Sequence, residues 1–252
     1  FDNLEVNITG VKLSKENQKR LDKLLAQAKE KNNLADYPKI RRFLEEFKVE
    51  QAIDDTIKDI KAGKQVVLFA ERVSDSKRDD GTISPGTLPL LEKKLKAAGI
   101  PYESIYGGTP TDADKKEIEN KVKRFQSGES KVIIGNPKSM GTGISLDDTT
   151  GKAPRTMRVL TTPYSSSEVI QMLGRINRLE TVSKAEAFFY QHDNPVDQWN
   201  QGILKDKLTT LGSVVKGEYD KVDLDKKGIP TAGKTKEPPP LNIDDYRRER
   251  EE

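Results

Sequence analysis

The residues best suited to chemistry lie in the segment 171–178, which reads QMLGRINR. On a helix with 100° per residue, Gln171, Arg175 and Arg178 would lie on one face. Two guanidinium groups on one face repel each other unless an anion lies between them, and a triphosphate suits their planar donor groups. The segment therefore predicts an anion-binding helix. The alternative is a surface helix with two solvated arginines.

The rest of this predicted helix is expected to be packed against a core. Its apolar residues fall on the opposite face; they are Val169, Met172, Leu173 and Ile176. Ser165 followed three residues later by Glu168 has the pattern of a capping box, which predicts that the helix begins there. Gly174 has no side chain, so another backbone or a ligand is able to approach it closely.

A second segment, Met140–Leu146, reads MGTGISL and directly follows a predicted strand. Gly141 and Gly143 allow a tight turn, and Thr142 and Ser145 supply hydroxyl groups. Ligands of open α/β sheets bind at the carboxyl ends of the strands, so this turn is a candidate contact to a nucleotide. The alternative is an ordinary turn between a strand and a helix.

A third segment, 106–110, reads YGGTP and follows another short predicted strand. The backbone N–H groups of Gly107, Gly108 and Thr109 are candidates to hold a nucleic-acid phosphate. The alternative is a plain loop that leads into a helix.

These segments are spaced along an alternation of strands and helices. Strands are expected at residues 66–70, 105–106, 132–134, 159–160 and 187–190, and helices end at Gly99 and Gly128. The alternation predicts an α/β fold with a parallel sheet and helices on both sides. We expect a helical extension over 1–62, the α/β domain over 63–195, a helical accessory segment over 196–225 and a flexible Pro-, Gly- and charge-rich tail over 226–252.

The composition excludes several other classes of site. The chain has no Cys and one His, His192, so disulfides, cysteine-based metal sites and His-dependent triads are not expected. A net charge of +3 permits nucleic-acid binding without arguing for it. Neither a membrane-spanning run nor a secretory signal is evident, which favours a cytoplasmic or nucleoid-associated protein.

Taken in order, these segments resemble the second RecA-like domain of superfamily 2 helicases over roughly residues 40–192. The segment 171–178 fits the family's motif VI, Q-x-x-G-R-x-x-R, at every fixed position. The supporting matches are 66–73 with the motif IV strand, 108–128 with the loop and helix that end in "RF-x-x-G", and 131–146 with motif V.

A narrower resemblance lies beyond the α/β domain. Residues 207–217 (KLTTLGSVVKG) resemble the "KL-x-SLGALT-x-GD" segment of strawberry-notch-type helicases and their bacterial and phage relatives. The strand at 158–163 with a serine-rich helix start after it also fits those proteins. Glu218 and Tyr219 depart from the Asp-Arg that the family carries next.

The resemblance implies roles for these residues. Arg175 and Arg178 would reach the γ-phosphate of ATP, one of them as an arginine finger, and Gln171 would position the nucleotide or the attacking water. Ser145 stands where many relatives have an acidic residue. The implied nucleotide contacts are Gly141, Gly143, Ser145 and Gly174, and the implied nucleic-acid contacts are Gly107, Gly108, Thr109 and Thr142.

The resemblance also implies that much of the machinery lies elsewhere. ATP and Mg²⁺ would be held mainly by a first RecA-like domain, which we expect in the same protein or in a partner chain. The segment 228–235 (GIPTAGKT) matches a P-loop literally, but it follows no buried strand and precedes a proline run, so we interpret it as a chance match. The expected partner is DNA or RNA, with DNA favoured.

Two other functions were weighed against this one. A non-catalytic, helicase-like binding or scaffolding module would have the same fold. A dinucleotide or nucleotide-sugar enzyme would need a G-x-G-x-x-G segment after a strand, which the sequence lacks.

Overall fold

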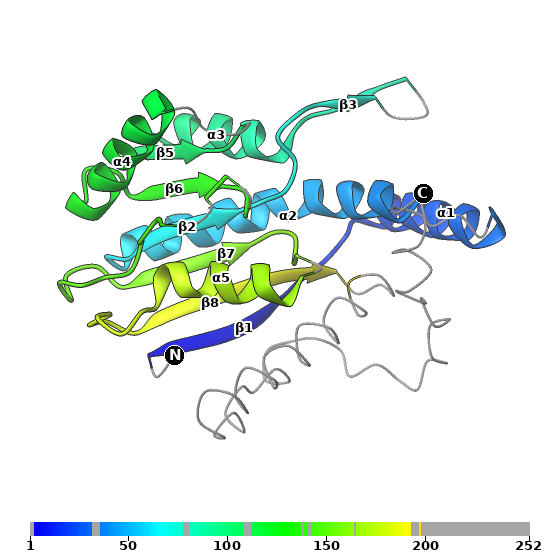
Figure 1. Cartoon of the computed structure of the whole chain (residues 1–252). Coiled ribbons are helices and arrows are strands. Elements are labelled where there is room, and N and C mark those ends of the chain that lie inside the picture. The colour runs from blue at the N-terminus through cyan, green and yellow to red at the C-terminus, as the bar shows by residue number, and fades with distance from the viewer. Residues whose placement is uncertain are drawn as a thin grey trace.

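The computed structural model describes residues 3–31, 36–77, 81–107, 112–137, 139–140, 143–163, 165–192 and 197 (Figure 1). A six-stranded sheet in the order β1-β8-β7-β2-β6-β5 forms its centre, and every pairing within it is parallel. The strands are β1 (Leu4–Val11), β2 (Gln65–Phe69), β5 (Tyr102–Ile105), β6 (Val132–Gly135), β7 (Arg155–Val159) and β8 (Ala185–His192). The predicted parallel sheet flanked by helices is therefore confirmed.

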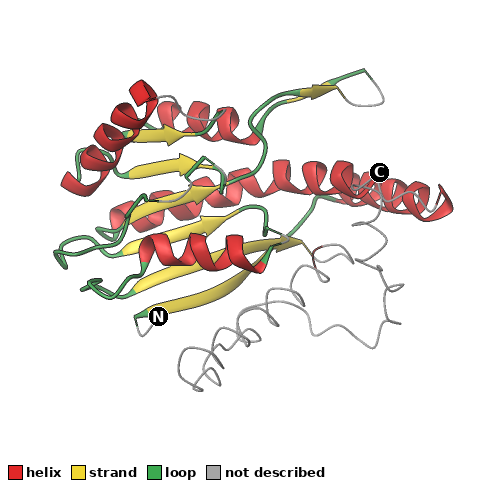
Figure 2. Ribbon diagram, viewed as in Figure 1, coloured by secondary structure: helices red, strands yellow, loops and turns green. Residues whose placement is uncertain are grey.

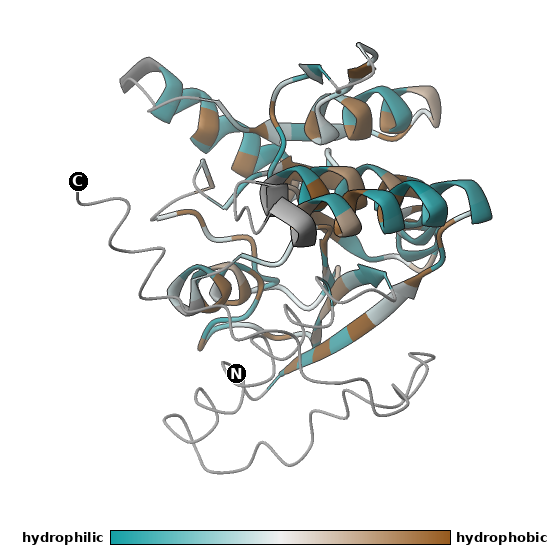
Figure 3. Ribbon diagram, turned by 90° about the vertical axis from the view of Figure 1, so that its right-hand side faces the viewer, coloured by the Kyte–Doolittle hydropathy of each residue, from teal (hydrophilic) through white to brown (hydrophobic). Residues whose placement is uncertain are grey.

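The described part of the chain has five helices. They are α1 (Lys15–Lys31), α2 (Asp36–Lys61), α3 (Thr87–Ala97), α4 (Asp112–Ser127) and α5 (Ser166–Ile176). Four of them, α2 to α5, cover the two faces of the sheet (Figure 2). As expected, α3 and α4 are followed by Gly99 and Gly128, whose φ angles of 67° and 82° suit glycine better than other residues. The helices carry both hydrophobic and hydrophilic residues (Figure 3), as expected for elements with one face in a core.

Alternate residues of the central strand β2 enter two different cores. Val67 and Phe69 pack in one cluster with Phe125 of α4 and Leu173 of α5. Val66 and Leu68 point to the opposite side, into a cluster shared with α2 and α3. Such burial on both faces is why these strands read as continuous apolar runs.

The strand β1 corrects the expectation that all of residues 1–62 are helical. The stretch Leu4–Val11 pairs in parallel with β8, with Leu4 opposite Ala185 and Val11 opposite His192. Its sequence, LEVNITGV, alternates apolar and polar residues with a period of two, and Val6 and Ile8 are buried. The helical interpretation of this stretch is wrong, because a period of two places its apolar residues on one face of a strand and not of a helix.

Two elements extend beyond the sheet (Figure 1). Helix α1 packs against the N-terminal part of α2 around a separate small core that includes Leu21, Ile40 and Leu44. A two-stranded hairpin, β3 (Ser76–Lys77) with β4 (Ile83–Ser84), projects from the segment between β2 and α3. No helix among the described residues has the length and apolar character needed to cross a membrane. The helix expected at 203–216 lies outside the described residues.

Candidate functional site

Helix α5 positions the residues of the predicted anion-binding segment. Val169, Met172, Leu173 and Ile176 are buried beneath it, as predicted, and Gln171 is exposed. The helix begins after Ser165, which is the N-cap residue, but no side-chain cap bond forms there. The Ser165 hydroxyl lies 2.6 Å from the hydroxyl of Ser167 instead. The predicted helix start is confirmed, and the predicted capping-box contact is wrong.

The two arginines of this segment meet at one acceptor. Nη1 of Arg175 and Nη2 of Arg178 each lie 2.9 Å from the backbone carbonyl oxygen of Ile144. Arg178 also donates from Nε to the carbonyl oxygen of Gly174 at 3.2 Å. The prediction that the two guanidinium groups lie together is therefore confirmed.

Arg178 reaches this position by a different path from the one expected. Helix α5 ends at Ile176, and its C-cap residue Asn177 has extended backbone angles, so Arg178 lies past the helix. The guanidinium group folds back along the helix end. The two arginines are thus not on one helical face, and the carbonyl of Ile144 gathers them instead.

Arg175 and Arg178 differ strongly in exposure. Arg175 is 8% exposed, whereas Arg178 is exposed to solvent. Burial lowers the pKa of Arg175 from its ordinary value, and the positive charge of Arg178 lowers it further. Guanidinium stays protonated in proteins, so both effects are a cost of keeping two cations together. An added negative charge beside the pair would offset that cost.

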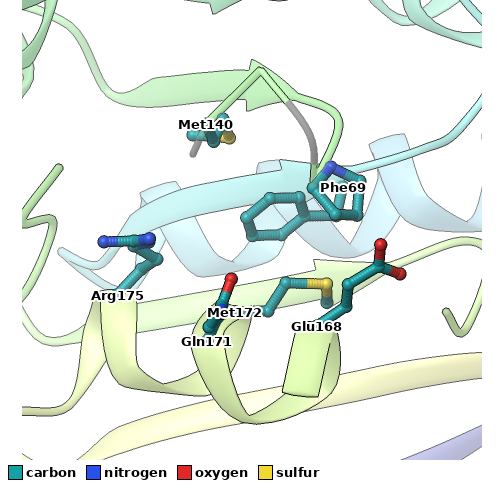
Figure 4. Close-up of a pocket in the computed structure, with 7 residues that line it drawn as sticks. Phe69, Met140, Glu168, Gln171, Met172 and Arg175 are labelled. Carbon is teal, nitrogen blue, oxygen red and sulfur yellow. The ribbon is translucent and has the colours of Figure 1, made fainter. Parts of the chain in front are cut away.

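A small pocket opens beside Arg175 (Figure 4). Figure 4 shows the side chains of Gln171 and Glu168 on α5 below it and Phe69 and Met140 above it. The complete lining is Phe69, Pro137, Met140, Glu168, Gln171, Met172 and Arg175. The pocket therefore combines apolar side chains with one cationic, one amide and one carboxylate group, and it lies between the end of β2 and the predicted motif VI helix.

The loop that carries Ile144 is tied directly to α5. The backbone N–H of Leu146 donates to the carbonyl oxygen of Arg175 at 2.9 Å. Gly143 has a φ of 101°, which glycine adopts without strain, and this agrees with the tight turn predicted there. The hydroxyl of Ser145 donates to the Asp147 carboxylate, so this hydroxyl is already engaged within the loop. Gly141 lies outside the described residues.

The two loops predicted to contact nucleic acid adjoin each other at the carboxyl ends of β5 and β6. The hydroxyl of Ser139 donates to the carbonyl oxygen of Gly107 at 3.3 Å. Gly107 is exposed and has a φ of 137°. Gly108, Thr109 and Thr142 lie outside the described residues.

Gly174 is the one site glycine on α5, and its surroundings are open. A Cβ built at this position meets nothing within 4 Å among the described residues. The close approach predicted for Gly174 is therefore not made by the described part of this chain. The outer face of α5 therefore has room for another domain or a ligand at Gly174.

Several residues of the site were missed from the sequence. Ile144 acts through its backbone carbonyl, which no residue pattern marks. Arg155 of β7 and Gln126 of α4 bond to the backbone of the same loop. Only the position of Gln126, inside the predicted Phe-Gln-Ser-Gly helix end, offered a signal.

A comparison with protein families identifies the class of domain. The family described as helicase conserved C-terminal domain matches residues 48–180, more than half of the chain. The chain belongs to this family.

One curated relative comes from Acanthamoeba polyphaga mimivirus and is named as an ATP-dependent RNA helicase. It is 28% identical to this chain over 148 residues, which are 59% of the chain and 24% of the relative. The chain thus spans about a quarter of the length of the curated relative that it matches.

Two solved structures are similar to the chain at low sequence identity. The Sulfolobus solfataricus SWI2/SNF2 ATPase core in complex with dsDNA matches 86% of this chain and 47% of its own, with a TM-score of 0.56 and 11% identity. The E. coli DEAD-box protein SrmB, bound to the regulator RraA, matches 59% of this chain and 72% of its own, with a TM-score of 0.41 and 18% identity. The first of these similarities supports the RecA-like fold.

Proposed function

We propose that this chain is the second motor domain of an ATP-dependent helicase or translocase, and that Arg175 and Arg178 serve the hydrolysis of ATP. One observation carries the proposal: two guanidinium groups share a single neutral acceptor, the carbonyl oxygen of Ile144. A carbonyl oxygen bears only a partial charge, so a phosphate oxygen would be the better partner for either cation. The residues present therefore fit a phosphoryl group.

The difference in exposure between Arg175 and Arg178 supports different roles for the two side chains. Arg178 is exposed and is able to turn toward a group that approaches from outside the chain. Arg175 is almost buried and holds the loop at Ile144 in place while adding positive charge. The amide of Gln171, beside the pocket, is placed to orient the nucleotide or a water molecule. ATP with Mg²⁺ supplies the phosphoryl group that is transferred.

The rest of the ATP site is proposed to lie on a first RecA-like domain. That domain would carry the P-loop and the acidic Mg²⁺ ligands and would approach the outer face of α5 at Gly174. The proposed nucleotide contacts of this chain remain Gly141, Gly143, Ser145 and Gly174. For Ser145 the contact would require its hydroxyl to leave the Asp147 carboxylate.

Nucleic acid is the proposed partner of the loops that follow β5 and β6. Gly107 and Ser139 are hydrogen-bonded to each other, which supports a joint role for the two loops. The further proposed contacts, from the sequence, are Gly108, Thr109 and Thr142. Backbone N–H groups contact phosphates without reading bases, so we expect weak, strongly salt-dependent binding. We propose DNA as the partner; the RNA helicase name of the mimivirus relative makes RNA the competing outcome. Affiliation with strawberry-notch-type helicases is also proposed, on residues 207–217.

A second candidate function has its own supporting observation. Because Arg175 and Arg178 already have a partner within the domain, they can act as a structural link between α5 and the loop at Ile144. In that case the chain is a non-catalytic, helicase-like binding or scaffolding module.

The test compares ATP hydrolysis by the protein joined to its first RecA-like domain, with and without Arg178→Ala. We expect turnover to fall about a thousandfold in this variant, because an arginine that stabilises the transferring phosphoryl group is worth about that factor or more. Arg42→Ala removes an exposed arginine on α2 and serves as the matched control. Turnover by Arg178→Ala at the level of the control would favour the non-catalytic module.

A further inference from the structure

The loop from Ile144 to Asp147 is held by four successive backbone carbonyl groups. The carbonyl of Ile144 accepts both site arginines. The carbonyl of Ser145 accepts Nε2 of Gln126 at 2.9 Å, and that of Leu146 accepts Nε of Arg155 at 2.8 Å. The carbonyl of Asp147 accepts Gln126 at 3.2 Å and Arg155 at 3.5 Å. Side chains from α4, β7 and the end of α5 thus converge on one short stretch of backbone.

Arg155 is the buried centre of this arrangement. It is 2% exposed and makes no ion pair with any carboxylate in the described part of the chain. Its guanidinium group lies 5.1 Å from the centre of the Phe125 ring and donates to Gln65 and to the carbonyl oxygen of Ala153. Burial lowers the pKa of Arg155 from its ordinary value. Its hydrogen-bond acceptors are all neutral, and the charges of Asp148 and Asp147 offset the cost of burying the cation only in part.

Gln126 connects the buried cation to the surface. Its Oε1 accepts Nη2 of Arg155 at 2.7 Å, while its Nε2 donates to the loop carbonyls of Ser145 and Asp147. The residue itself is exposed at the end of α4. Gln126 therefore joins Arg155 to the loop backbone by hydrogen bonds at both ends of its amide group. Because its side chain is exposed, Gln126 can be replaced without opening a core cavity.

We propose that Arg155 and Gln126 are positioning residues that fix the carbonyl of Ile144, and through it the geometry of Arg175 and Arg178. The role rests on the proposed function, in which those two arginines act on a phosphoryl group. A misplacement of about 1 Å by a group remote from the chemistry can cost about 100-fold in rate. Among the described residues, Arg155 and Gln126 are connected to Arg175 and Arg178 through the backbone of the loop, whose Ile144 carbonyl accepts both site arginines.

The test uses Gln126→Glu, which separates positioning from stability. The carboxylate keeps the length of the side chain and gives Arg155 an opposite charge, so the melting temperature is expected to stay level or rise. The amide donors to Ser145 and Asp147 are lost, and a carboxylate oxygen then faces two carbonyl oxygens. We expect the loop to shift and the arginines to shift with it.

The first readout uses the chain as it stands, with ¹⁵N-labelled arginine side chains followed by NMR. The Nε–H signals of Arg175 and Arg178 are expected to move and to exchange with solvent at least about tenfold faster in Gln126→Glu. The control is Arg124→Gln, on the same helix as Gln126, which removes an ion pair with Glu103 of β5 and has no contact with the loop. It is expected to lower the melting temperature and leave both signals in place.

The second readout is turnover by the protein that includes the first RecA-like domain. Gln126→Glu is expected to lower kcat at least about tenfold with little change in the KM for ATP. Combined with Arg178→Lys it is expected to add little, because residues that act as a unit are not additive. Unaltered signals, or altered signals with unchanged kcat, would overturn the positioning role. Full turnover by Arg178→Ala would overturn the proposed function instead, whatever the signals do.

Discussion

Arg175 and Arg178 hold their guanidinium groups against one oxygen atom, with a donor–acceptor distance of 2.9 Å for each. Two cations that share one acceptor repel each other, and the carbonyl of Ile144 offsets the repulsion only in part. An anion bound beside Arg175 and Arg178 would therefore lower the electrostatic cost of keeping the two cations together. This is the relationship on which the predictions for ATP hydrolysis depend.

Arg178→Ala is expected to remove activity without removing the fold. Its side chain is exposed and leaves no cavity, so the melting temperature should change little. Ground-state affinity for ATP should fall much less than turnover, because the first domain is proposed to hold most of the nucleotide. Steady-state hydrolysis and thermal melting, measured on the same preparations, check this. A loss of turnover only in proportion to a loss of fold would mark Arg178 as structural.

Arg175→Ala is expected to damage both activity and stability. The side chain is 8% exposed, so its removal opens space beneath the loop at Ile144 as well as removing a charge. Arg175→Lys restores the charge but not the fork of donors, and should recover the melting temperature more than the turnover. Equal recovery of both quantities by lysine would contradict a specific role for the guanidinium group.

Ile176→Ala is expected to show the opposite pattern from Arg178→Ala. Ile176 is fully buried beneath α5, and its truncation should cost on the order of 2–5 kcal/mol of unfolding free energy. Chemical denaturation of the chain measures this directly. The matched control is Ile170→Ala on the exposed face of the same helix, where the cost should be small. Similar costs for the two variants would mean that α5 is not packed as described.

Gly174→Ala tests whether a second body approaches α5. In this chain an added Cβ meets open space, and alanine is a better helix former than glycine by about 1 kcal/mol, so the chain itself should be as stable or more stable. In the protein with its first RecA-like domain, the same methyl group is expected to lower ATP turnover. Unchanged turnover would show that no domain comes close at this point.

The sequence predicted the central sheet well because its strands are buried on both faces. The segment Gln65–Phe69 is apolar almost throughout, and its place between helices left little freedom in its assignment. Strand β7 was expected at 159–160 and instead spans Arg155–Val159. Its polar residues hid it, since Arg155 and Arg158 are buried and hydrogen-bonded to Gln65 and Asp59, which are far from them in the sequence.

The site was predictable in its residues but not in its geometry. The spacing of Arg175 and Arg178 showed that they would act together. The helix end at Ile176, which places Arg178 past α5, depends on how the following backbone packs on the sheet. The acceptor at Ile144 is a backbone atom, so no side-chain pattern could mark it. Gln126 and Arg155 are brought to it by the order of the strands alone.

The buried carboxyl group of Glu45 predicts a pH dependence of stability. Glu45, on α2, is 1% exposed and accepts the backbone N–H of Glu71 at 2.7 Å. Burial, with a smaller effect from the charge of Glu71, raises its pKa from 4.5 to about 7, although the Glu71 N–H, Lys48 and Arg72 act in the other direction. The folded chain thus binds a proton here under conditions in which the unfolded chain has released it.

The sign of the effect follows from this difference in protons. Between pH 4.5 and about 7 the folded state holds more protons at Glu45 than the unfolded state, so the unfolding free energy falls as the pH rises through that window. The loss is on the order of 3 kcal/mol once the pH is above 7. Glu45→Gln keeps an acceptor for the Glu71 N–H and cannot ionise. It should match the parent chain near pH 5 and exceed its stability near pH 8, as measured by chemical denaturation. Asp54→Asn, at an exposed carboxylate of the same helix, controls for the loss of one negative charge and should leave the shape of the pH profile unchanged. Parallel profiles for the parent chain and Glu45→Gln would mean that Glu45 is already ionised in the folded state near neutral pH, held so by Lys48 and Arg72.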